Sequence, residues 1–133
     1  MRGADPVQLV IMLYDIVLAD LQRAMAAFGS GDVERRTNEL KHALAAVEQL
    51  QGTLEMERGG QAAQQLDRFY DFARAQILEA QLRQSPERLA RLAGAFGSVR
   101  QAWEELRSRT MEPAVMIVPR APVASSAMTS WTV

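Results

Sequence analysis

Glu39 and His42 form the spacing in this chain that is most suggestive of chemistry. They stand three positions apart, and a Glu-x-x-His step on a helix supplies metal ligands in dimetal carboxylate bundles. Such a centre uses the step twice, whereas His42 is the single histidine of the sequence. His42 also points away from the apolar stripe of its own segment. The pattern therefore predicts a solvated surface histidine and no metal site.

Carboxylates at short spacing are the second candidate. Asp67 and Asp71 lie one helical turn apart, and Glu104 and Glu105 are adjacent, each set alternating with arginines. That alternation is typical of exposed charged faces, whereas general acid and base catalysis needs two carboxylates whose environments separate their pKa values. A serine or threonine nucleophile would need a neighbouring base, which an outward histidine does not provide. We expect no enzyme activity and no cofactor.

Charge and composition argue against several further classes of protein. Fifteen basic and sixteen acidic residues give a net charge of -1, which offers no electrostatic attraction to nucleic acid or to an anionic membrane. The most apolar run, residues 7–19, includes Gln8 and Asp15 and is shorter than the about 20 residues of a membrane-spanning helix. The lack of cysteine suits a reducing compartment. We expect a cytoplasmic protein without nucleic-acid binding or membrane insertion.

Apolar residues recur at three- and four-residue steps in four segments, which predicts four helices. The expected helices cover about residues 6–28, 32–55, 60–83 and 86–108. Asp5-Pro6 and Ser85-Pro86 each place a capping residue before a proline, a typical helix start. Gly29 is expected to end the first helix in the left-handed conformation. Gly59-Gly60 is expected to form the turn between the second and third helices.

Four such segments with short connections favour an all-α fold, an antiparallel up-and-down four-helix bundle over residues 1–110. Residues 111–133 are rich in Pro, Ser, Thr and Ala and have no helical period. This composition predicts a C-terminal non-helical tail, either flexible or docked on the bundle.

The first helix carries more apolar side chains than a bundle helix needs. Val10 and Tyr14 belong to the stripe that faces the expected core, whereas Leu9, Met12 and Ile16 fall on a different flank. A bundle helix buries a stripe roughly 100° wide, so something else must cover this flank. The tail could pack there, the bundle could self-associate, or the flank could border a groove for an amphipathic or extended partner.

Several motifs follow one another along the chain. They are Asp5-Pro6-x-x-Leu9-x-x-Met12-Leu13-Tyr14-Asp15, Leu54-x-x-Glu57-x-Gly59-Gly60, Leu66-x-x-Phe69-Tyr70-x-Phe72 and a late Trp103. From about residue 4 to 107, this series resembles the flagellar secretion chaperone family FliS. The resemblance implies a cytoplasmic helical bundle that binds the disordered C-terminal region of flagellin, prevents premature polymerisation and aids export. It also suggests the export-gate protein FlhA as a second partner.

The surplus flank and the resemblance together predict a partner-binding site. Its residues are Leu9, Met12, Leu13 and Ile16 from the first helix and Ala45 and Gln49 from the second. Leu13 also fits the core stripe, and Ile16 stands where the family commonly has a small residue. When the groove is vacant, the apolar run from Val115 to Val118 is expected to occupy it. The alternative function is a self-associating helical scaffold or adaptor without flagellin binding, and we expect a monomer or a weak homodimer.

Overall fold

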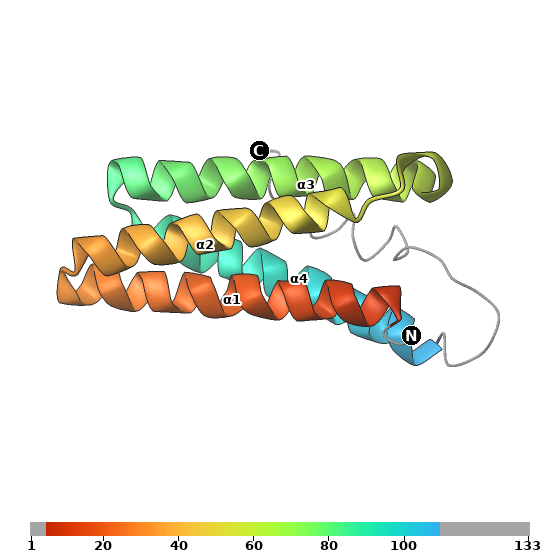
Figure 1. The fold of residues 1–133 in the computed structure, drawn as a ribbon, viewed down its shortest axis with the longest axis horizontal. Helices are drawn as coiled ribbons and strands as arrows, with labels where there is room; N and C mark the ends of the chain where they lie inside the picture. The colour runs from red at the N-terminus through yellow and green to blue at the C-terminus, as the bar shows by residue number, and fades with distance from the viewer. Residues whose placement is uncertain (1–4, 110–133) are drawn as a thin grey trace.

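The structure of the protein is a computed structural model that describes residues 5–109. In this range the chain forms four α-helices joined by short connections (Figure 1). Their bounds are α1 Pro6–Ser30, α2 Val33–Gly52, α3 Met56–Arg83 and α4 Pro86–Arg109. The predicted tail, residues 111–133, and its apolar run lie outside the described residues.

Successive helices run in opposite directions along one long axis (Figure 1). Helix α1 packs against α2 and α4, and α3 packs against the same two helices. The pairs α1 with α3 and α2 with α4 therefore lie across the diagonals of the bundle. This arrangement confirms the predicted all-α class and the antiparallel up-and-down topology.

The starts of α1 and α2 are capped by aspartate side chains, and the cap of α1 is the one predicted at Asp5. The backbone N–H of Gln8 donates to Oδ1 of Asp5 at 2.8 Å, and Pro6 follows the cap. At α2, the backbone N–H of Arg35 donates to Oδ1 of Asp32 at 3.1 Å. Both contacts give a partner to a backbone donor that the helix itself leaves unpaired.

The end of α1 lies two residues later than predicted. The helix passes through Gly29 and continues to Ser30, and Gly31 adopts the left-handed conformation with φ 75°. The backbone N–H of Gly31 donates to the carbonyl of Phe28 at 3.2 Å. A residue without Cβ enters this conformation at little steric cost. The prediction chose the wrong glycine of two, because both follow Phe28 closely.

The turn between α2 and α3 also differs from the prediction. Helix α2 ends at Gly52, and Oγ1 of Thr53 donates to the carbonyl of Leu50 at 2.7 Å. Helix α3 then begins at Met56, before the glycine pair. Gly60, with φ 59° and ψ -135°, interrupts the helical geometry inside α3. The break predicted at the glycine pair is therefore present at Gly60, although one helical turn from Met56 precedes it. Figure 1 shows the chain continuing in the direction of α2 beyond that helix and doubling back at the start of α3.

Aromatic side chains form the centre of the core. Tyr14, Phe69, Tyr70 and Phe96 are fully buried, with ring centroids 5.1 Å apart for Tyr14 and Phe96 and 4.8 Å for Phe69 and Phe96. The hydroxyls of Tyr14 and Tyr70 share a buried hydrogen bond of 2.8 Å across the α1–α3 diagonal. Burial raises the pKa of both tyrosines. This bond satisfies two polar groups at the centre of the core.

Candidate functional site

One flank of α1 exposes three large apolar side chains. Leu9, Met12 and Ile16 keep 48%, 51% and 38% of their surface accessible, and their spacing places them on one side of the helix. Val10 and Tyr14 of the same segment are buried in the core. We call Leu9, Met12 and Ile16 the α1 ridge. The other three helices leave this ridge uncovered, as the surplus of apolar residues in the sequence predicts.

A groove between α1 and α2 adjoins the ridge. It has a volume of about 490 Å³ and is lined by Ile16, His42, Ala45, Ala46, Glu48 and Gln49. The structure thus brings together Ile16, Ala45 and Gln49, three of the predicted site residues. Leu9 and Met12 are exposed on α1 but do not line the groove. Leu13 is half-buried and packs against the core, which leaves it a supporting position.

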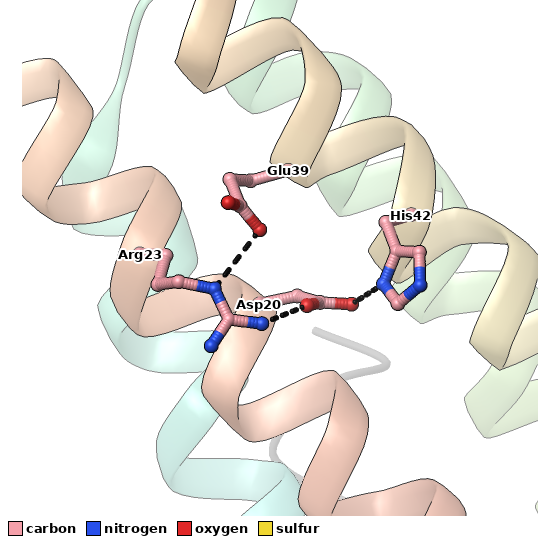
Figure 2. A network of polar contacts seen from close by, with 4 residues as sticks. All are labelled: Asp20, Arg23, Glu39 and His42. Carbon is pink, nitrogen blue, oxygen red and sulfur yellow. Dashed lines mark hydrogen bonds and ion pairs between the residues drawn. The ribbon is translucent and has the colours of Figure 1, made fainter.

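Four charged or titratable side chains connect the two helices beside the groove (Figure 2). Nη2 of Arg23 donates to Oδ1 of Asp20 at 2.7 Å, and Nδ1 of His42 lies 2.6 Å from Oδ2 of the same carboxylate. Nε of Arg23 also donates to Oε1 of Glu39 at 3.1 Å. We call Asp20, Arg23, Glu39 and His42 the charged network. The charged network joins α1 to α2, and one of its members, His42, also lines the groove.

Asp20 is the central residue of this network, and sequence reasoning missed it together with Arg23. The side chain of Asp20 has an accessible fraction of 0%. A buried carboxylate is costly unless opposite charges and hydrogen bonds compensate it, and Arg23 and His42 supply both kinds of contact. The available signal was its place on the wheel of α1, next to the core stripe. An acidic residue at such a position predicts a polar partner on a neighbouring helix.

His42 is exposed, as predicted, but it is not merely solvated. Its side chain keeps 65% of its surface accessible while the ring contacts Asp20. Glu39, the other member of the Glu-x-x-His step, pairs with Arg23 instead. Among residues 5–109, no three potential ligands of the Asp, Glu, His or Cys type gather as a metal site would require. The step serves the contact between α1 and α2.

Of the two carboxylate pairs in the sequence analysis, the aspartates connect α2 to α3, whereas Glu104 pairs within its own helix. Nε2 of Gln51 in α2 donates to Oδ1 of Asp67 at 2.9 Å and to Oδ1 of Asp71 at 2.8 Å, both in α3. Glu104 lies 3.3 Å from Nη2 of Arg100 within α4. The two aspartates are therefore engaged by an amide from the adjoining helix.

Exposed apolar side chains also occur on the outer face of α3, at Leu78 and Leu82. Neither residue lines the groove between α1 and α2. Leu78, with 57% of its surface accessible, resembles Met12 in exposure and offers a matched reference position. Within the described helices, none combines the length and the apolar run that crossing a membrane requires.

Comparison with known proteins gives a consistent result. A family model described as "Flagellar protein FliS" matches residues 1–110. The chain is 30% identical over 105 residues to the flagellar secretion chaperone FliS of Salmonella typhimurium, which covers 78% of each chain. It is 29% identical over 106 residues to the protein of that name from Vibrio cholerae, covering 80% of this chain and 78% of the relative. A Bacillus subtilis protein of that name is 26% identical over 102 residues, or 77% of this chain and 75% of the relative.

Proposed function

We infer the function from the premise that this chain belongs to the FliS family of flagellar secretion chaperones. We propose that it binds the disordered C-terminal region of flagellin in the cytoplasm, prevents premature polymerisation and aids export of the subunit, without catalysis. The observation that supports this proposal is the exposed α1 ridge beside the groove between α1 and α2. Such a surface suits a segment that becomes ordered as it binds.

The ridge would supply the apolar part of the contact. Covering Leu9, Met12 and Ile16 removes apolar surface from water, which stabilises a complex by about 25 cal/mol per Å². Ordering a disordered segment opposes binding by about 2–5 kcal/mol or more, and such complexes bury on the order of 1,000–3,000 Å². Three side chains cannot provide that area. The bound segment must therefore continue from the ridge onto the α2 residues that line the groove.

The α2 side of the groove suits such a continuation. Ala45 and Gln49 are exposed and line the groove. The small side chain of Ala45 lets a partner backbone approach closely, and the amide of Gln49 can pair with the polar groups of a backbone that has no hydrogen bonds of its own. Leu13, half-buried beneath the ridge, would support the apolar contact rather than make most of it.

Titration of the protein with a labelled C-terminal fragment of flagellin from the same organism tests the proposal. Met12→Glu and Ile16→Glu each place a charge where an apolar contact is expected, and we expect each to weaken binding by more than about tenfold, equivalent to about 1.4 kcal/mol. Leu78→Glu is the matched control, because Leu78 is similarly exposed but lies on α3. Far-UV circular dichroism checks that helicity is retained. Equal affinity of all three variants and the wild type would place the client on another face.

Self-association is the competing function for the same ridge. Light scattering with and without the flagellin fragment separates the two, because a chaperone gains the mass of one fragment and a scaffold keeps the mass of its own oligomer. Persistent oligomers that ignore the fragment would favour the scaffold. We propose FlhA as a further partner, to be tested by adding its purified cytoplasmic part to the protein with and without bound fragment.

A further inference from the structure

The His42 ring is held on one side and open on the other. Nδ1 lies 2.6 Å from Oδ2 of the buried Asp20, and Figure 2 shows Nε2 on the far side of the ring, turned away from that carboxylate. Within the described part of the chain, no hydrogen bond to Nε2 accompanies the contact at Nδ1. His42 is also one of the residues that line the groove. The ring thus presents an unpaired nitrogen beside the surface where the partner is expected.

Asp20 determines which ring nitrogen carries the proton. Its other oxygen accepts from Arg23 at 2.7 Å, and a carboxylate in this position can only accept from the histidine, so Nδ1 must be the donor. In a neutral ring, the second nitrogen then carries a lone pair. When the ring is neutral, Nε2 of His42 is therefore a hydrogen-bond acceptor whose direction is fixed by a buried residue.

The surrounding charges select the kind of group that can meet this acceptor. Arg23 is the cation in contact with Asp20, whereas acidic groups come from α1 at Asp20 and from α2 at Glu39 and at Glu48, which lines the groove. With a neutral His42 these groups have a net negative charge. An anionic client group would be repelled here, whereas an N–H or O–H donor fits.

We propose that Nε2 of His42 accepts a hydrogen bond from an N–H or O–H group of the flagellin segment bound in the groove. His42 would be a specificity-determining residue, and Asp20 a positioning residue that fixes its ring. This inference rests on the proposed function and refines it, because it adds a directional polar contact to an apolar ridge. A client segment with a donor at this point would be preferred over one without it.

Two substitutions of His42 separate its two nitrogens. His42→Asn places an amide near the position of Nδ1, so the contact with Asp20 can be kept while the acceptor in the groove is lost. His42→Gln places an amide near the position of Nε2, so a polar group remains in the groove while the contact with Asp20 is lost. Thermal unfolding and titration with the labelled flagellin fragment are measured for both variants and the wild type.

The proposal makes opposite predictions for affinity and stability. His42→Asn should keep the melting temperature and bind the fragment about fivefold more weakly, the effect expected for one hydrogen bond. His42→Gln should melt lower and bind more tightly than His42→Asn.

The outcomes are separable. Failure of the wild type to bind the fragment would refute the proposed function and this inference with it. If the wild type binds the fragment and His42→Asn binds it equally well, only the inference is refuted. The inference is also refuted if affinity falls in parallel with the melting temperature in His42→Asn and His42→Gln. Asp20→Asn supplies a final check. In the protein that retains His42, a less firmly held ring should weaken binding of the fragment. In the His42→Asn background, the same substitution should have no further effect on affinity.

Discussion

The two apolar sides of α1 contain similar residues and have different surroundings. The inner side places Val10, Tyr14 and Val17 in the core, where the neighbouring helices enclose them. The outer side presents Leu9, Met12 and Ile16 to solvent, next to the groove. The inner side chains stabilise the fold, because folding removes them from water. The outer side chains are available to stabilise a complex, because they remain accessible after folding.

Each side of α1 also has one buried polar contact, and these two contacts differ in kind. Tyr14 and Tyr70 form a neutral pair inside the core, where one shared hydrogen bond satisfies both hydroxyls. Asp20 is a carboxylate that needs cations or donors, and it meets Arg23 and His42, whose own side chains reach solvent. The comparison indicates that a neutral pair can lie wholly inside a core, whereas a buried carboxylate is placed where its partners can reach solvent.

The largest expected effect is the difference in the free energy of unfolding between a substitution on the inner side of α1 and one on its outer side. Leu21→Ala removes a fully buried core side chain and should lower the free energy of unfolding by about 2–5 kcal/mol. Met12→Ala on the ridge should change it by less than about 0.5 kcal/mol. Urea denaturation followed by circular dichroism measures both. A comparable loss in the two variants would show that the ridge is buried in solution.

A smaller effect is expected from the neutral pair in the core. Tyr70→Phe leaves the buried hydroxyl of Tyr14 without its Tyr70 partner, which should lower the free energy of unfolding by about 1–3 kcal/mol. Binding of the flagellin fragment should be unaffected, because neither tyrosine reaches the groove. A loss of affinity at unchanged stability would mean that the core pair shapes the groove.

The same pair predicts how stability depends on alkaline pH. Burial raises the pKa of Tyr14 and Tyr70 above their ordinary value of 10.0, so the folded protein retains these protons when the unfolded chain releases them. Their contribution is complete below about pH 10 and declines as the pH rises further, by up to about 1.4 kcal/mol per pH unit for each tyrosine. Tyr14 and Tyr70 are the two tyrosines of the chain, so phenolate absorbance should appear together with unfolding. Phenolate that forms while circular dichroism is unchanged would contradict this prediction.

The smallest effect is expected at the surface between α1 and α4. Nε of Arg100 donates to Oδ1 of Asp15 at 2.6 Å, and both side chains are partly exposed. Asp15→Asn should therefore lower the free energy of unfolding by less than about 1 kcal/mol, and added salt should diminish the difference. Thermal melts at low and high ionic strength provide the measurement, and a salt-independent loss would indicate a role beyond the ion pair.

Much of the fold and part of the candidate site followed from local patterns. The helical wheel separated Leu9, Met12 and Ile16 from the core stripe, and all three are exposed. It does not decide the edges of the stripe: Ile11 is buried, whereas Leu13, which fits the core stripe, is half-buried. Residues at the edge of a stripe become buried or exposed according to how the neighbouring helices cross, which the wheel of one helix does not contain.

The charged network could not be predicted in the same way. Asp20 and His42 are 22 positions apart, and their contact depends on the relative register of α1 and α2. The connection at Gly31, between the end of α1 and the start of α2, sets that register. A shift of one residue in either helix rotates a side chain by about 100°, which would separate the carboxylate from the imidazole.

The amino-acid sequence by itself determined the four amphipathic segments, the caps that begin α1 and α2, and the excess of apolar residues on one flank of the first helix. These depend on interactions within a few residues, so composition and spacing contain them. The tertiary structure decided that this flank borders a groove, that Asp20 is buried there, and that His42 faces both. Such features depend on the packing of helices distant in sequence, where small rotations decide which side chains meet.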